Sequence, residues 1–230
     1  MKNYVLCLKH GTKYSSEYVN ILFNMTKKHL TVDYEFVCLT ENSQGLDPNI
    51  RVLPLNLSEN IEGWWYKPMV FNPELGLEGI VLFLDLDIVI FENIDRLFTY
   101  KPNKFCIIKD YHAKRTGKKG MNSSCFRFDY NTNSQVYYNF IEKPNEIMNS
   151  MHGDQDWIQK SIQSNYEYWP DKWVKSFKWE MHNEKEFVKN GNRCVIKSNP
   201  KIEPENCIAV FHGYPKPDQV DQKWCKENWR

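Results

Sequence analysis

The sequence lacks several patterns that mark whole classes of protein. Its 30 Lys and Arg residues are balanced by 29 Asp and Glu residues, a formal net charge of +1, so no broad basic surface for nucleic acid is expected. No stretch approaches the ~20 uncharged apolar residues of a transmembrane helix, and the first ten residues hold no apolar signal-peptide core. Internal repeats and low-complexity segments are also absent. With 230 residues, 41% of them hydrophobic, the chain is expected to form one compact, soluble domain.

Two common families of binding motif are missing as well. The seven cysteines are scattered, odd in number and never spaced as CxxC, which argues against structural zinc and against a disulfide framework. We therefore expect reduced thiols and a cytoplasmic location. No GxGxxG follows the first predicted strand, so a classical dinucleotide site is not expected.

The hydrophobic periodicity predicts an α/β fold. Apolar runs predict strands at 4–8, 34–39, 50–55, 80–91, 105–108 and 207–211, and helical spacing predicts helices from Ser15, over 136–142 and from 154. The order of the first elements is the opening of a Rossmann-like nucleotide-binding half. Residues 112–121 are predicted to be a basic loop, either a lid over phosphates or, as we favour, an exposed surface loop. Residues 182–206 are predicted to be a surface excursion.

Two carboxylates interrupt the most apolar stretch of the chain, residues 80–91. On one strand, Asp85 and Asp87 would point to the same face, about 6–7 Å apart. Like charges this close at the end of a buried strand repel unless a cation lies between them, and hard oxygen ligands suit Mg²⁺ or Mn²⁺. The plainer alternative is that the two aspartates end the strand and are solvated.

Three motifs in one order add a family resemblance. They are Asp85-Leu86-Asp87 within its apolar strand, Asp154-Gln155-Asp156 before an apolar-periodic helix, and His212-Gly213 followed by Lys216-Pro217. Together they resemble the GT-A glycosyltransferases, most closely those of family 8. The resemblance implies a GT-A fold over residues 1–217, a single compact domain with a Rossmann-like mixed sheet flanked by helices. Residues 218–230 would be a C-terminal tail that packs against this domain.

The resemblance also implies an activity. The protein would be a metal-dependent hexosyltransferase that uses Mn²⁺ or Mg²⁺, takes a hexose from UDP-glucose (or, second, UDP-galactose) and retains the anomeric configuration. Its acceptor, whether glycan, lipid, protein or small molecule, is not indicated. Two rivals stay open, a sugar-phosphate nucleotidyltransferase and a non-catalytic relative that only binds sugar nucleotides or glycans.

The same resemblance assigns roles to residues. The metal ligands would be Asp85, Asp87 and His212. The residues facing the donor sugar, with the catalytic role, would be Asp154, Gln155 and Asp156. The donor nucleotide-sugar would be bound by Leu8, Lys9, Tyr14, Thr40, Glu41, Lys67, Asp85, Leu86, Asn122, Ser123, Gly213 and Lys216.

Each assignment has a structural alternative. Lys9 suits a solvated turn, Glu41 an ordinary loop, and Lys67, which stands where the family usually has Arg and so loses the bidentate fork, suits a helix start. Asp154 and Asp156 suit the first turn of a helix, where carboxylates are favourable without any catalytic role. The aromatic and basic stretch 167–179 suits either the acceptor side or core packing.

Overall fold

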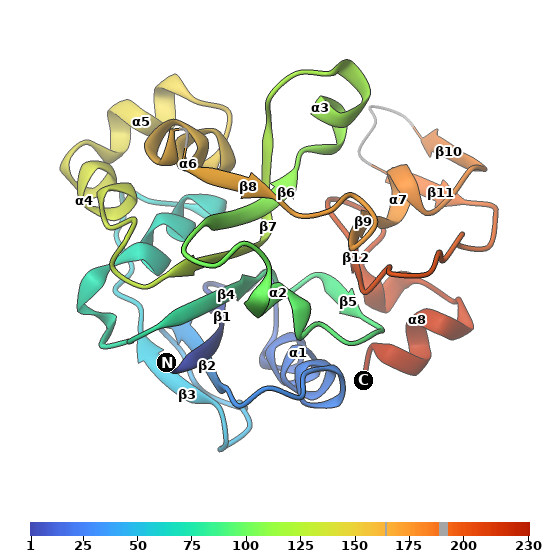
Figure 1. Ribbon diagram of the computed structural model, residues 1–230, viewed down its shortest axis with the longest axis horizontal. Helices are drawn as coiled ribbons and strands as arrows, with labels where there is room; N and C mark the ends of the chain where they lie inside the picture. The colour runs from blue at the N-terminus through green and yellow to red at the C-terminus, as the bar shows by residue number, and fades with distance from the viewer. Residues whose placement is uncertain (164, 189–192) are drawn as a thin grey trace.

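The computed structural model describes residues 1–163, 165–188 and 193–230, and its centre is a seven-stranded mixed sheet (Figure 1). The strand order is β3-β2-β1-β4-β7-β6-β8. β7 runs antiparallel to both of its neighbours, and the other neighbouring pairs are parallel. The strands are β1 (Asn3–Lys9), β2 (Glu35–Thr40), β3 (Arg51–Pro54), β4 (Ile80–Leu84), β6 (Phe105–Lys109), β7 (Met121–Asp129) and β8 (Tyr166–Tyr168).

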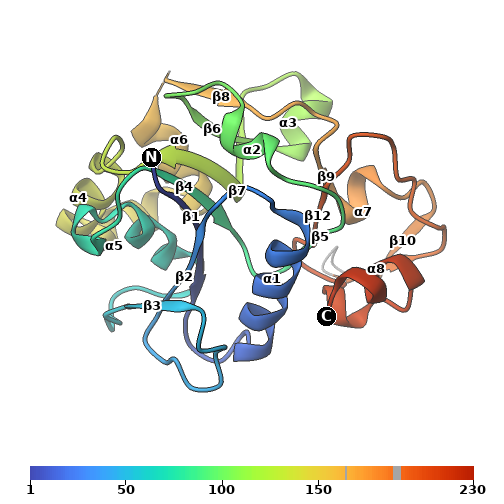
Figure 2. The ribbon, with the colours of Figure 1, turned by 60° about the horizontal axis from the view of Figure 1, so that its bottom comes forward.

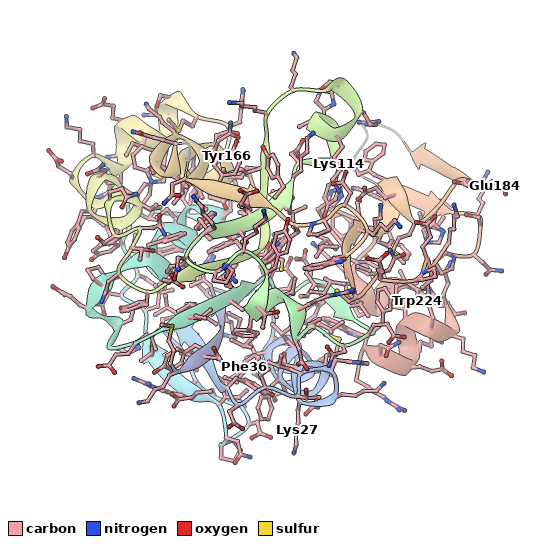
Figure 3. All side chains as sticks on the ribbon, viewed as in Figure 1. Lys27, Phe36, Lys114, Tyr166, Glu184 and Trp224 are labelled. Carbon is pink, nitrogen blue, oxygen red and sulfur yellow. The ribbon has the colours of Figure 1, made fainter. Side chains whose placement is uncertain are left out.

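Both faces of this sheet are covered, which is why its central strands are continuous apolar runs. Alternate residues of β1 belong to different cores: Val5 and Cys7 to one, Tyr4 and Leu6 to the other. Helix α1 (Ser16–His29) covers the first face. The second is covered by η1 (Gly63–Phe71), α4 (Gln135–Glu142) and α6 (Asp154–Ile162), with α5 (Pro144–Ser150) beside them. Figure 3 labels Phe36, which packs on Phe23 of α1 with ring centroids 5.3 Å apart. The predicted mixed sheet flanked by helices is confirmed.

A second sheet and the C-terminus complete the molecule. Strands β5 (Ile88–Ile90), β12 (Ile208–Val210) and β9 (Val174–Ser176) form a three-stranded sheet, and β10 (Lys185–Val188) pairs with β11 (Arg193–Ile196). The short helices are η2 (Pro73–Leu75), α2 (Arg96–Thr99), α3 (Tyr111–Thr116), α7 (Phe177–Glu180), η3 (Pro217–Gln219) and α8 (Lys223–Asn228). Figure 2 shows α8 beside α7 at the edge that holds the C-terminus. There Trp224 packs edge-on against Phe91, with ring centroids 5.7 Å apart.

One strand expectation is wrong in a way that matters for the site. The run 80–91 is not one strand: β4 ends at Leu84, which pairs with Cys125 in the large sheet, and β5 starts at Ile88, which pairs with Val210 in the small one. The chain therefore changes sheets at residues 85–87, which we call the sheet switch. Hydrophobic periodicity reports burial, not which sheet a residue joins, so the run looked continuous.

The basic loop expected at 112–121 is also wrong in part, because it contains α3. Asp110 caps this helix, its Oδ1 accepting hydrogen bonds from the backbone nitrogens of His112 (2.9 Å) and Ala113 (3.0 Å). Gly117, at a φ of 72°, ends the helix. Asn122 and Ser123, assigned above to donor binding, lie within β7. Among the helices that the structure describes, none is long and apolar enough to cross a membrane.

Candidate functional site

The predicted motifs meet where the parallel strands of the large sheet end. Two backbone hydrogen bonds hold the sheet switch in place: Asp85 N donates to Ser124 O (2.9 Å), and Phe211 N donates to Asp87 O (3.0 Å). The first motif is thereby attached to β7 on one side and to the segment before His212 on the other. Ligands of open α/β sheets collect at this carboxyl edge.

A hollow of about 150 Å³ opens beside the sheet switch. Six of the predicted site residues line it: Leu8, Tyr14, Lys67, Asp85, Leu86 and Asp87. The sequence analysis did not single out its other lining residues, His10, Lys13, Gly63 and Trp64. Trp64 is 56% exposed at the rim of this hollow.

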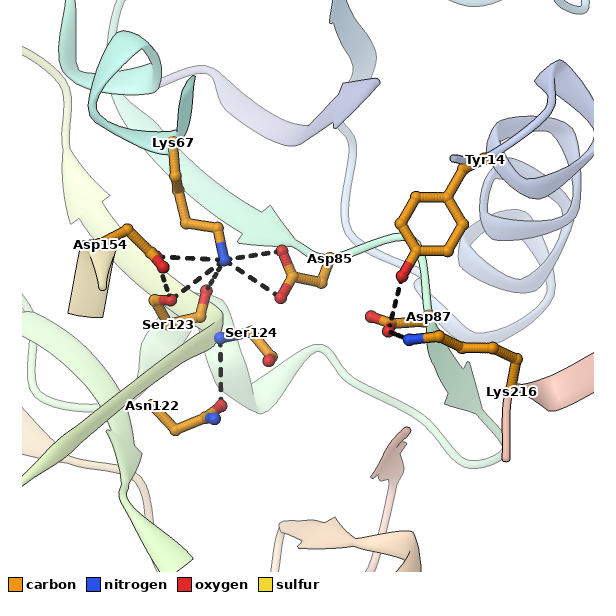
Figure 4. Close-up of polar contacts among 9 residues, drawn as sticks. All are labelled: Tyr14, Lys67, Asp85, Asp87, Asn122, Ser123, Ser124, Asp154 and Lys216. Carbon is orange, nitrogen blue, oxygen red and sulfur yellow. Dashed lines mark hydrogen bonds and ion pairs between the residues drawn. The ribbon is translucent and has the colours of Figure 1, made fainter. Parts of the chain in front are cut away.

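Lys67 connects three of the predicted segments (Figure 4). Its Nζ lies 2.9 Å from Asp85 Oδ1 and 3.5 Å from Asp154 Oδ2, and it donates hydrogen bonds to Oγ (3.0 Å) and the carbonyl (3.2 Å) of Ser123. Ser123 Oγ in turn donates to Asp154 Oδ2 at 2.5 Å. Burial alone would lower the pKa of Lys67, but the carboxylates of Asp154 and Asp85 outweigh it, and the pKa is raised. Lys67 is therefore a buried ammonium ion that binds η1, the sheet switch, β7 and α6 together.

Asp87 has its own pair of partners. Tyr14 donates its hydroxyl hydrogen to Asp87 Oδ2 at 2.9 Å, and the Lys216 ammonium forms an ion pair with the same oxygen (Figure 4). Burial and the neighbouring Asp87 charge raise the pKa of Tyr14, so the phenol remains a hydrogen-bond donor at neutral pH. Lys216 comes from a loop 129 residues further along the chain.

His212 lies at the same edge but binds elsewhere. Its Nε2 is 2.6 Å from Ser176 Oγ, and its ring stacks on Tyr111 with centroids 5.1 Å apart. Burial, followed by the Lys178 charge, lowers the pKa of His212 to about 4, so the imidazole is neutral at physiological pH.

The predicted metal ligands do not form one coordination group here. In the described parts of the chain, no three His, Cys, Asp or Glu side chains lie close enough together to hold a metal ion. Asp85 is bound by Lys67, Asp87 by Lys216 and Tyr14, and His212 by Ser176. As they stand, these residues do not fit a three-ligand metal site, and their assignment to Mn²⁺ or Mg²⁺ stays a prediction.

The remaining predicted residues divide into near and far. Lys9 and Thr40 are buried neighbours at the ends of β1 and β2, and Glu41 Oε1 accepts from the backbone nitrogen of Gly11 at 2.7 Å. All three thus border the loop after β1. Asn122 is buried in β7, and its Oδ1 accepts from Ser124 N at 3.2 Å, away from the Lys67 contacts.

The Asp154-Gln155-Asp156 motif is split by its helix. Asp154 contacts Lys67, whereas Gln155 and Asp156 line a different hollow, of about 560 Å³, together with Lys118, Lys119 and Lys160 among others. Successive side chains on an α-helix point about 100° apart, so three consecutive residues cannot face one ligand. The sequence analysis treated the three as one group.

Comparison with known proteins is informative only through the fold. No family model and no curated protein matches the sequence. Among solved structures, galactosyltransferase LgtC in complex with donor and acceptor sugar analogues is 12% identical with a TM-score of 0.64, over 99% of this chain and 96% of that one. An active-site mutant of LgtC gives 12% identity and a TM-score of 0.65, over 97% and 93%. The chain has the fold of these glycosyltransferases.

This glycosyltransferase fold extends to a further solved protein. GlyE of Streptococcus pneumoniae TIGR4 is 14% identical with a TM-score of 0.65, and the match covers 94% of this chain but only 56% of GlyE. The GT-A resemblance seen in the three motifs is confirmed for the fold over nearly the whole chain. Within this fold, Lys67, Asp85 and Ser123 lie together at the sheet switch.

Proposed function

We propose that this protein is a glycosyltransferase that moves a hexose from a nucleotide-sugar to a hydroxyl acceptor. UDP-glucose is the first choice of donor and UDP-galactose the second. One observation carries the proposal: the buried Lys67 ammonium joins Asp85, Ser123 and Asp154, residues of three separate predicted segments, beside a hollow at the carboxyl edge of the sheet. A purely structural end to β4 would not need a buried cation shared by two carboxylates.

The proposed binding follows the positions of the side chains. Leu8, Tyr14 and the ends of β1 and β2 would hold the nucleoside. Lys216 would bind the diphosphate, and Asp154, held by Lys67 and Ser123, would face the donor sugar. Gln155 and Asp156, which line the second hollow, would contact the sugar or acceptor from that side.

The chemistry requires a charged leaving group to be stabilised. The bond between the anomeric carbon and the diphosphate oxygen breaks, an oxocarbenium-like state forms, and negative charge collects on the departing UDP. A preorganised ammonium such as that of Lys216 favours this charge. The acceptor hydroxyl oxygen would form the new bond on the same face, and its proton would pass to the departing diphosphate. Because the predicted metal ligands do not come together, no step is assigned to a metal.

The first experiment is UDP release from a panel of UDP- and GDP-sugars, with Mn²⁺ and then with EDTA. Slow hydrolysis of one donor would support the proposal and identify the donor, and its loss in EDTA would establish a metal requirement. Donor binding by calorimetry without release under any condition would favour the non-catalytic relative. If the protein neither binds nor hydrolyses any donor of the panel, the proposal is refuted.

An Asp87→Ala variant sharpens this test. It removes the shared partner of Tyr14 and Lys216, so donor binding and release are expected to be lost while the fold persists. Lys223→Met is the matched control, because the Lys223 side chain is 88% exposed on α8. Unchanged turnover of Asp87→Ala would mean that the sheet switch is not the donor site.

A further inference from the structure

Strands β9 and β12 run parallel and side by side, so the segments that follow them leave the small sheet at the same edge. Val210 is paired with Ser176. The next residues of one strand are Phe211, His212 and Gly213, and those of the other are Phe177 and Lys178. Phe177 and Phe211 stack with ring centroids 4.1 Å apart, which fixes the two segments against one another.

This packing brings a buried lysine onto the turn at Gly213. Lys178 is only 8% exposed, and its Nζ lies 2.9 Å from the point where a Cβ on Gly213 would be. Gly213 also has a φ of 74°, a conformation that side chains disfavour. The positive φ is the reason for glycine at this position, and the short distance to Lys178 Nζ shows that this ammonium lies close to the backbone of the turn.

Two ammonium groups thus flank the His212–Gly213 turn. Lys216 Nζ donates to the carbonyl of Phe211 at 3.3 Å and binds Asp87, while Lys178 approaches Gly213. Phe211 and Gly213 lie only two residues apart, so both ammonium groups lie at the same turn. Each ammonium group can donate a charge-assisted hydrogen bond to a phosphate oxygen that reaches this turn.

We infer that Lys178 is a second diphosphate-binding residue, which contacts the donor phosphates opposite Lys216. The inference rests on the proposed function and deepens it. A nucleoside diphosphate presents at least two negative charges and several acceptor oxygens, and lysine binds such oxygens as a mobile point charge. The sequence analysis placed Lys178 in the stretch 167–179, as part of either the acceptor side or the core, and did not assign it to the donor.

The test compares two ligands that differ only in phosphate. Lys178→Met is expected to weaken UDP binding by about tenfold or more, the size of one charge-assisted hydrogen bond, and to leave uridine binding unchanged. Lys175→Met is the matched control: Lys175 lies three residues earlier, its side chain is 19% exposed, and it pairs with Glu180 at 3.7 Å. The control is expected to bind UDP like the wild type.

The outcomes separate this inference from the proposed function. If Lys178→Met binds UDP within about twofold of the wild type while Lys216→Met weakens it, the Lys178 assignment is refuted and the donor site stands. If Lys178→Met weakens UDP and uridine equally, Lys178 is structural and the assignment is again refuted. If the wild type binds neither UDP nor any donor, the proposed function fails and the inference with it. Should Lys178→Met not fold, Lys178→Gln, with a polar end, is read in the same assays.

Discussion

Replacing Lys67 with methionine removes the charge that two buried carboxylates share. Methionine nearly preserves the side-chain volume, so the change is electrostatic. Lys67 forms ion pairs with Asp85 (2.9 Å) and Asp154 (3.5 Å), and its own side chain is 8% exposed. Breaking a buried pair by removing one partner destabilises proteins by about 3–5 kcal/mol. Since Asp85 keeps 23% of its side-chain exposure and can take up a proton, we expect the lower end, about 3 kcal/mol.

The destabilisation is expected to depend on pH. Burial already raises the pKa of Asp85, and the Lys67 charge opposes that rise. Without Lys67, the folded protein would hold Asp85 with a pKa still further above that of the unfolded chain. This carboxylate would therefore destabilise the variant most at alkaline pH and progressively less as the pH falls and it binds a proton.

Urea denaturation at about pH 8 and about pH 5, followed by circular dichroism, measures the loss of stability and its dependence on pH. In thermal unfolding, a loss of ~3 kcal/mol corresponds to a melting temperature lower by roughly 6–12 °C in a chain of this size. Lys172→Met is the control, because its side chain is 64% exposed and its ion pair with Glu205 should contribute less than about 1 kcal/mol. A Lys67→Met variant as stable as wild type, or one destabilised equally at both pH values, would refute the argument. Adding Asp154→Asn to Lys67→Met should recover part of the lost stability, because one uncompensated charge is removed.

Three further predictions concern the rest of the chain. Arg127 is fully buried and donates hydrogen bonds to four backbone carbonyls, among them those of Phe98 (3.0 Å) and Tyr100 (2.7 Å). Arg127→Met should therefore lower the free energy of unfolding, measured by urea denaturation, by about 3–5 kcal/mol. A loss below about 1 kcal/mol would contradict this prediction. Burial acts to raise the pKa of Asp95, but hydrogen bonds from Thr31 outweigh it and the pKa is lowered. The stability gained is therefore complete above the unfolded pKa and lost as the pH falls through the folded one, so the difference between wild type and Asp95→Asn should shrink below about pH 4 in acid titrations. Six cysteines are buried free thiols, so a thiol reagent should label them only at the rate of unfolding; they are Cys7, Cys38, Cys106, Cys125, Cys207 and Cys225. Because the sequence holds seven cysteines, rapid labelling of more than one thiol in the native protein would show a more open core.

The sequence predicted the elements of the fold well because their signals are local. Apolar runs marked β1 and β2, and helical spacing marked α4 and the start of α6. Within residues 218–230, predicted only as a tail, the structure forms α8, with Cys225 buried. The prediction of a single strand over 80–91 failed at residues 85–87, because the two halves of this apolar run belong to different sheets. Hydrogen-bond partners of a strand are long-range, and periodicity carries no information about them.

The candidate site shows the same division. By itself the sequence determined which residue types are present: a pair of aspartates in an apolar strand, carboxylates at a helix start and a His-Gly turn followed by lysine, in the order that resembles the GT-A glycosyltransferases. Only the tertiary structure decided their partners. In the structure Asp85 pairs with Lys67, and Asp87 pairs with Lys216. His212 is hydrogen-bonded to Ser176. Asp154 contacts Lys67, whereas the two residues after it line another hollow. The physical reason is that the residue type alone fixes the chemistry of a side chain. Which cation neutralises a buried carboxylate depends instead on how segments pack together, and these segments are as many as 129 residues apart in the chain.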